Sequence, residues 1–267
     1  MTNSLNSGHT QLAAGKTIRL GRIMGPDGHT VIVALDHGVS GIRELGALAQ
    51  PEKFIAEISL AGADCVLVTP GSARRFAPAI GRLGMIIRID GGPTSATGRW
   101  NNIRPMMEVE DAQKLGADGV VVMGLIGTEA EEESLRYVAS IAAECDRLGM
   151  VLIAEMLPGG LTATELSIDQ LAVAAHVGAE LGADIIKLPY RGPPDQFRIV
   201  TSNCYRPVVV LGGPKREDGN FLDDLAGAME ANAAGVAIGR NIWSDPEPGN
   251  ITSQLVNIVH DTPSKST

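Results

Sequence analysis

The sequence predicts a single-domain α/β protein, a (β/α)₈ TIM barrel, from three observations. A phrase of small residues followed by aliphatic ones occurs three times, with a looser fourth copy, and other aliphatic runs lie between the copies. Amphipathic segments separate most of these runs. The chain has 267 residues, and eight βα units in about 250 residues are typical of this barrel.

The repeated phrase marks junctions at which a helix ends and a strand begins. Each copy follows a helical pattern, places a glycine or another small residue at the helix end, and then starts a β-branched run. The copies are AGADCVLV (61–68), LGADGVVV (115–122), LGADIIKL (181–188) and NAAGVAIG (232–239). We therefore predict four strands at these positions.

Four further runs have the length and composition of strands that are buried on both faces. They are TVIVALD (30–36), GMIIRID (84–90), MVLIAEM (150–156) and PVVVLGG (207–213). Helical patterns between the strands include PEKFIAEISLAGA, EEESLRYVASIAAECDRLG, SIDQLAVAAHVGAELGA and NFLDDLAGAMEANA. The two groups of runs together give eight predicted strands.

A doubly wound open sheet is the structural alternative, because a strand pattern does not show whether the sheet closes. The dinucleotide-binding fingerprint G-x-G-x-x-G is absent after the first predicted strand. We expect the barrel over residues 17–261, with a flexible N-terminal tail over 1–16 and a C-terminal tail over 262–267. The turn-rich stretch GGPTSATGRWNNIRP after the third strand is typical of a loop at a catalytic face.

Composition excludes several classes of function. The net charge is −9 and no basic cluster stands out, so nucleic acid is not an expected partner. The three cysteines lack C-x-x-C spacing and the five histidines lack metal-binding spacing, so we expect neither a metal nor another cofactor. No secretion signal and no run of about 18 apolar residues is present, which favours a cytoplasmic protein without a membrane span.

Lys187 is the most informative residue, because it lies within the aliphatic run ADIIKLP of a predicted buried strand. Burial disfavours an ammonium ion, so a lysine in a barrel mouth can present a neutral amine that attacks a carbonyl and forms an imine. A purely structural lysine that pairs with Asp36 or Glu155 remains the alternative. Asp36 ends the first strand, where it can move a proton, bind a hydroxyl group or pair with Lys187.

A candidate phosphate site follows the last two predicted strands. VVVLGGPK and GVAIGRNIW place Gly212, Gly213 and Gly239 in tight turns, with Arg240 beside them. Loops at these positions of the barrel commonly bind phosphate, because glycine lets backbone N–H groups approach an anion. Tight packing of helix on strand is the other interpretation of the glycines.

The motifs ALDHG, ADIIKLPYRG, VVVLGGPK and AAGVAIGRNIW together resemble the archaeal-type class I fructose-bisphosphate aldolase family. That family also includes aminodideoxyheptulosonate synthase and an autoinducer-processing thiolase, and the similarity runs from Gly21 to Asp261. The resemblance implies a TIM barrel with Lys187 as the Schiff-base lysine and Asp36 as a second catalytic carboxylate. It also implies a phosphate site at the two glycine turns, and a homo-oligomer.

One departure from the family pattern concerns proton transfer. Aldolases of this family carry a tyrosine in a YPRG motif after the fifth strand, whereas this chain reads EMLPGG and has Leu157 at that position. Glu155, which lies two residues earlier on the same strand face, and Tyr190 are candidate replacements, with Asp36 a third. The arginine of the motif is also missing, with Gly159 and Gly160 in that region.

We therefore expect an aldehyde-lyase that cleaves a phosphorylated ketose, such as fructose 1,6-bisphosphate, through an imine and an enamine. A thiolase or transaldolase-like transferase, which uses the same lysine on a phosphorylated ketone, is the first alternative. The thiolase branch also lacks the tyrosine. A barrel that binds a sugar phosphate without catalysis is the second alternative, and retention of Lys187 and Asp36 argues against it.

Overall fold

A computed structural model describes residues 14–40, 44–99, 101–213 and 220–261 of the chain. Eight parallel strands form a closed barrel in the order β1-β10-β9-β8-β7-β6-β3-β2. The strands are β1 (Thr30–Ala34), β2 (Cys65–Val68), β3 (Gly84–Arg88), β6 (Gly119–Gly124), β7 (Val151–Met156), β8 (Ile185–Pro189), β9 (Val208–Leu211) and β10 (Gly235–Ile238). Because β1 pairs with both β2 and β10, the barrel prediction is confirmed and the open-sheet alternative is wrong.

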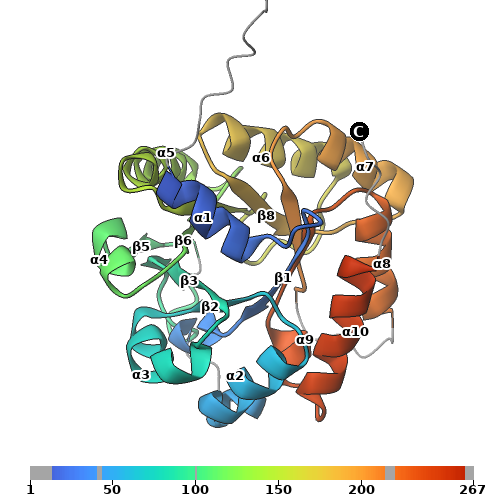
Figure 1. Ribbon diagram of the computed structural model, residues 1–267. Coiled ribbons are helices and arrows are strands. Elements are labelled where there is room, and N and C mark those ends of the chain that lie inside the picture. Colours follow the sequence, from blue (N-terminus) through green and yellow to red (C-terminus); the bar gives the residue numbers. More distant parts are fainter. Residues whose placement is uncertain (1–13, 41–43, 100, 214–219, 262–267) are drawn as a thin grey trace, which may run out of the picture.

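Helices surround the strands, as Figure 1 shows. They are α2 (Pro51–Leu60), α3 (Pro70–Ile80), α4 (Val109–Lys114), α5 (Glu131–Leu148), α6 (Ile168–Glu180), α7 (Pro194–Ser202), α8 (Phe221–Glu230), α9 (Arg240–Trp243) and α10 (Pro248–His260). Local sequence sets several boundaries: Ser167 and Gln170 form a capping box at the start of α6, and Gly149 ends α5 in the left-handed conformation, with φ of 63°. Short 3₁₀ turns cover Asp36–Ser40 and Gly46–Ala49.

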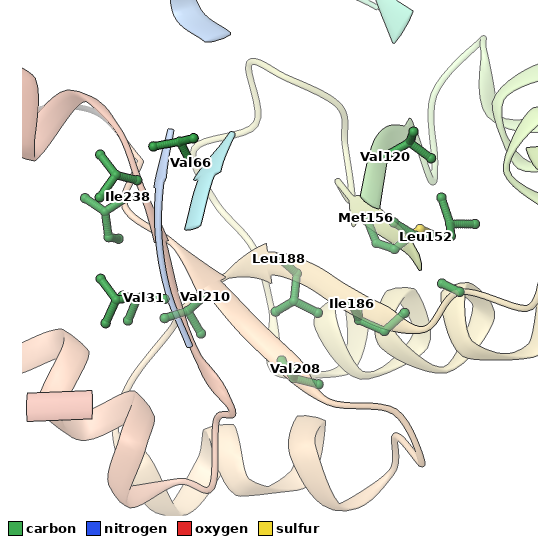
Figure 2. Close-up of a cluster of buried hydrophobic side chains, with 14 of the residues drawn as sticks. Val31, Val66, Val120, Leu152, Met156, Ile186, Leu188, Val208, Val210 and Ile238 are labelled. Atoms are coloured by element: carbon green, nitrogen blue, oxygen red, sulfur yellow. The ribbon is translucent and has the colours of Figure 1, made fainter. Parts of the chain in front are cut away.

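The strands bury two different apolar layers, one on each face. Side chains that point outward pack under the helices, and Figure 2 shows part of this layer, including Val31, Leu152, Ile186 and Val210. Side chains that point inward fill the barrel, among them Ile32, Ile86, Val121, Ile153, Ile185 and Val209. Burial on both faces explains why the strands are continuous aliphatic runs.

The helix α1 (Ala14–Ile23) covers one end of the barrel (Figure 1). Leu20, Ile23 and Met24 pack against the apolar side chains of the barrel interior. Lys16 is buried, with its Nζ 2.5 Å from Asp146 Oδ1 and 3.0 Å from Asp184 Oδ2. The expected N-terminal tail of residues 1–16 is therefore wrong for its last three residues, because an open barrel end would expose apolar side chains to water.

The rest of both expected tails, residues 1–13 and 262–267, lies outside the described residues.

After β3, the turn-rich stretch contains the two-residue strands β4 (Asp90–Gly91) and β5 (Arg104–Pro105), which pair in antiparallel register. None of the helices in the described ranges is long and apolar enough to cross a membrane.

Candidate active site

Lys187 and Glu155 meet inside the barrel mouth. Neighbouring strands β7 and β8 pair these two residues in register, so their side chains lie on the same inward face. The Lys187 Nζ lies 2.8 Å from Glu155 Oε1. The two residues are only 6% and 8% exposed. This buried ion pair places an amine and a carboxylate where the strands of a (β/α)₈ barrel carry their functional groups.

Arg88, at the end of β3, joins the carboxylates around this pair. Its Nε donates to Asp36 Oδ2 at 2.5 Å, its Nη1 donates to Asp90 Oδ1 at 2.9 Å, and its Nη2 donates to Glu155 Oε2. The guanidinium group is buried, with the residue 5% exposed. A planar fork with five N–H donors suits three carboxylates at once, as an ammonium group does not.

These contacts decide which carboxylates are ionised near neutral pH. Burial alone would raise the pKa of Glu155, but the charges of Lys187 and Arg88 hold that pKa below its ordinary value. Burial opposes ionisation of Asp36 too, and Arg88, His37 and Lys187 outweigh it, so the pKa of Asp36 is lowered. Asp36 and Glu155 are therefore anionic groups that can accept a hydrogen bond or a proton.

His37 follows Asp36 in the 3₁₀ turn after β1. Its Nδ1 lies 3.4 Å from Asp36 Oδ1, and its ring stacks edge-to-face on Trp243, with ring centroids 5.7 Å apart. Burial lowers the pKa of His37, and the positive charges of Lys187 and Arg240 lower it further against the opposing effect of Asp36. His37 is therefore a neutral imidazole near pH 7, in the electrostatic range of Lys187 and Arg240.

A cavity of about 520 Å³ opens beside the ion pair. Glu155, Leu157, Tyr190, Gly212 and Gly213 are among the residues that line it, so the structure brings these predicted residues together at one cavity. Leu157 gives the cavity an apolar wall on its side and is itself 6% exposed. Leu157 packs in a small cluster with Ile103, Met123 and Leu125. The position that carries a tyrosine in the resembled family thus offers no polar group here.

Tyr190 is oriented differently from Lys187. It belongs to the outer layer of side chains, its ring contacts Phe197 edge-to-face at 4.9 Å, and its hydroxyl group lies against Gly227 of α8. Burial raises the pKa of Tyr190. Tyr190 lies three positions after Lys187, and an odd offset turns side chains to opposite faces of an extended chain. This geometry argues against Tyr190 as the group that replaces the missing tyrosine.

The two glycine turns lie next to each other after β9 and β10. Gly213 has a φ of 64°, which a residue with a Cβ rarely adopts. Asn241 joins the turns, since its Nδ2 donates to Gly212 O at 3.1 Å. A Cβ on Gly239 would lie 2.2 Å from His37 Cε1. Gly239 therefore also serves close packing, which was the second interpretation of these glycines. Arg240 is half-buried and begins α9.

Sequence reasoning missed Arg88 and Asn241. A signal for Arg88 was present in the buried run GMIIRID. Ile86, Arg88 and Asp90 share one strand face, so this face of an aliphatic run carries two charged residues. Asn241 had no such signal, because its contact with Gly212 depends on the distance between two loops. Within the described ranges, no group of three or more His, Cys, Asp or Glu side chains is arranged to hold a metal ion.

Comparison with known proteins places the chain in a family. The profile of the DeoC/LacD family aldolases matches residues 30–245. The chain belongs to this family. It is 34% identical over 248 residues to 2-amino-3,7-dideoxy-D-threo-hept-6-ulosonate synthase of Halobacterium salinarum, with 93% of this chain and 92% of that protein covered. The barrel is thus the scaffold of an aldolase, an enzyme that acts on carbon–carbon bonds.

One further relative and two solved structures extend the comparison. Fructose-bisphosphate aldolase class 1 of Thermoproteus tenax is 29% identical, with 92% of this chain and 95% of that protein covered. A solved archaeal fructose 1,6-bisphosphate aldolase superimposes with a TM-score of 0.84 at 28% identity, over 92% of this chain and 99% of that chain. In a second archaeal fructose-1,6-bisphosphate aldolase structure (TM-score 0.83, 28% identity, 92% and 99% covered), the catalytic lysine is covalently bound to the carbinolamine intermediate. The family resemblance is confirmed.

Proposed function

We propose that this aldolase forms an imine between Lys187 and a phosphorylated ketose and then breaks or makes the adjacent carbon–carbon bond. The observation that carries the proposal is the buried pair of Lys187 and Glu155 at the barrel mouth, 2.8 Å apart beside a cavity of about 520 Å³. A buried lysine beside a proton acceptor is the arrangement that amine nucleophiles need. The carbinolamine on the lysine of a structural relative supports the same chemistry.

The first step joins lysine to substrate. The Lys187 ammonium gives one proton to Glu155, and the freed Nζ lone pair attacks the ketose C2 to form a carbinolamine. Glu155, whose Oε1 faces Nζ, carries this proton and then a second proton from nitrogen to the former carbonyl oxygen. That oxygen leaves as water, so that an iminium ion forms and Glu155 is again a carboxylate. Asp36, ionised on the other side of Arg88, is placed to bind a substrate hydroxyl group.

The second step breaks the bond between C3 and C4. The C4 hydroxyl proton passes to the Glu155 carboxylate, the C3–C4 electron pair moves into the iminium ion, and an aldehyde leaves. Glu155 then returns the proton to C3 of the enamine, and water hydrolyses the resulting iminium ion to release the ketone and the free lysine. Protons and electrons balance without a metal or a redox cofactor, and Glu155 performs the task that Leu157 cannot.

The substrate phosphate is proposed to bind at the turns of Gly212, Gly213 and Gly239 with the Arg240 side chain. The position of these turns after β9 and β10 supports this assignment, since loops after the last two strands of such barrels bind phosphate. Arg240 also lies close enough to His37 for its charge to lower the pKa of that imidazole. Arg240 therefore contributes positive charge at the mouth.

A transferase is the second candidate. Two relatives with 34% and 35% identity are 2-amino-3,7-dideoxy-D-threo-hept-6-ulosonate synthases, and the Thermoproteus tenax fructose-bisphosphate aldolase is 29% identical. In a transferase reaction, the enamine on Lys187 would attack a second aldehyde instead of taking up a proton. The absence of a tyrosine at Leu157 favours this outcome, because fewer groups compete to protonate the enamine.

Borohydride trapping tests the proposal. Reduction in the presence of fructose 1,6-bisphosphate or dihydroxyacetone phosphate should add the mass of the reduced ketone phosphate to Lys187. Lys187→Met should abolish both labelling and turnover, whereas Lys114→Met, which changes an exposed lysine of α4, should alter neither. Labelling at another lysine would overturn the assignment. Analysis of products with and without an added acceptor aldehyde separates the lyase from the transferase.

Self-association is a further part of the proposal, because homo-oligomers are implied by the family resemblance. Several large apolar side chains are exposed on the described surface, including Leu60, Val173 and Tyr205. Light scattering tests the proposal, and a monomer at micromolar concentration would contradict it.

A further inference from the structure

We infer that Arg88 is a positioning residue of the reaction: its guanidinium group fixes Glu155 and Asp36 and leaves a single Glu155 oxygen for exchange with Lys187. The inference rests on the proposed imine chemistry at Lys187. It adds a residue that neither the sequence motifs nor the family resemblance singled out.

The two oxygens of Glu155 have different partners. Oε2 accepts from Nη2 of Arg88, whereas Oε1 lies 2.8 Å from Nζ of Lys187. A carboxylate with one oxygen held in this way cannot rotate freely, so the second oxygen keeps its direction toward the amine. Proton transfer depends on such geometry before it depends on pKa. Arg88 therefore selects the oxygen that can exchange a proton with Lys187.

Arg88 is itself anchored from the opposite side. Asp90 is fully buried, and its Oδ1 accepts from Arg88 Nη1 at 2.9 Å. The other oxygen, Oδ2, accepts from the backbone N–H of Met123 at 2.6 Å. This chain of contacts runs from the backbone of β6 through Asp90 and Arg88 to Glu155 and Lys187. Backbone atoms thus fix the guanidinium plane, and the guanidinium fixes the carboxylate.

Charge supports the same role. Five ionisable groups face one another in the mouth: Lys187 of β8, Arg88 of β3, Glu155 of β7, Asp90 of β4 and Asp36 after β1. His37 and Arg240 lie within electrostatic range of this cluster. Without Arg88, three buried carboxylates would face one lysine. Glu155 would then keep its proton at higher pH, because its pKa would rise.

Three substitutions test the inference with fructose 1,6-bisphosphate as the probe, after borohydride labelling of Lys187 in the unmodified protein. Arg88→Gln removes the charge, Arg88→Lys keeps the charge but not the fork, and Asp90→Asn removes the anchor. Arg22→Gln is the matched control, because Arg22 pairs with Asp118 outside the site and its side chain is 63% exposed. Circular dichroism checks that each variant folds.

We expect Arg88→Gln to lower kcat by about 100-fold or more while KM changes little, because proton transfer is worth about 10² to 10⁴ in rate. The acid limb of its kcat profile should move to higher pH. Arg88→Lys should also lose kcat but keep the acid limb of the unmodified protein. Asp90→Asn should not move the acid limb to higher pH, because this substitution removes a negative charge instead of a positive one. Arg22→Gln should behave like the unmodified protein.

A folded Arg88→Gln variant with an unchanged kcat and pH profile would overturn the inference. If that variant does not fold, Arg88→Lys decides the question, because full kcat in this variant would show that the fork is not needed. Failure of the proposed function has a different signature: the unmodified protein would then show no label at Lys187, whatever Arg88 does.

Discussion

Lys187 and Glu155 are register partners on two neighbouring parallel strands, and the Nζ of one lies 2.8 Å from the Oε1 of the other. Each is flanked in sequence by aliphatic residues that point outward under the helices. The alternation of side chains along a strand therefore turns a single charged residue of each run into the barrel. Two polar positions, 32 residues apart along the chain, become one site.

Glu155→Gln should lower turnover by about 10² to 10⁴-fold, while Lys187 still forms the trapped imine more slowly, with water carrying the protons of that step. The amide keeps the size of the side chain and one acceptor oxygen but cannot accept a proton. The measurement is kcat together with mass spectrometry after borohydride reduction. Glu133→Gln is the control, because Glu133 is an exposed carboxylate that pairs with Arg104. Full turnover of Glu155→Gln would show that Asp36 or water, and not Glu155, carries the proton.

Leu157→Tyr should restore part of the turnover lost in Glu155→Gln. The substitution puts a phenol at the position that carries a tyrosine in the resembled family, beside the same cavity. Leu157 is closely packed with Ile103, Met123 and Leu125, so we expect a stability loss of about 1–3 kcal/mol from overpacking. Kinetics of the double variant check the rescue, and thermal unfolding checks the packing cost. Absence of any rescue in a folded double variant would argue against proton transfer at this wall of the cavity.

Arg240→Ala should weaken binding of phosphorylated ligands. A charge-assisted hydrogen bond is worth about 1.5–3 kcal/mol, so KM for fructose 1,6-bisphosphate should rise by about 10 to 100-fold, with a smaller change in kcat. Arg82→Ala is the matched control, because Arg82 is exposed and its guanidinium donates to Ser59 O, away from the site. Equal affinity of the variant and the unmodified protein for inorganic phosphate, measured by calorimetry, would contradict the phosphate assignment.

His260 makes the stability of the fold depend on pH. At the end of α10, its Nδ1 lies 2.7 Å from Asp27 Oδ2 and its Nε2 lies 3.0 Å from Asp64 Oδ2. Burial alone would lower the pKa of His260, but the two carboxylates raise that pKa above its ordinary value. The stabilisation is therefore fully present below the unfolded pKa of about 6.5 and is lost as pH rises through the folded pKa.

His260→Gln should thus cost about 1 kcal/mol of stability at pH values below about 6 and much less in alkaline solution. Thermal unfolding of both proteins at an acidic and an alkaline pH measures the difference. His176→Gln, at an exposed position of α6, should show no such dependence. A difference that grows with rising pH would contradict the assignment.

Much of the site followed from the order of residues. The barrel, the inward position of Lys187 and the cavity contact of Glu155 were predictable, because strand period and strand ends determine where such groups lie. The sequence did not show that the ring of Tyr190, which follows Pro189 at the end of β8, turns outward to Phe197. The boundary of the N-terminal tail failed because the helix of Ala14–Ile23 owes its place to the barrel end that it covers.

The sequence by itself determined the eight strands, their inward and outward faces and the chemical types present at the mouth. Only the tertiary structure decided which of these groups touch. Arg88 shares its guanidinium among Asp36, Asp90 and Glu155 because closure of the barrel brings the ends of β1, β3 and β7 around one interior. Periodicity along a chain specifies the face of a side chain, whereas the distance across a barrel depends on all eight strands together.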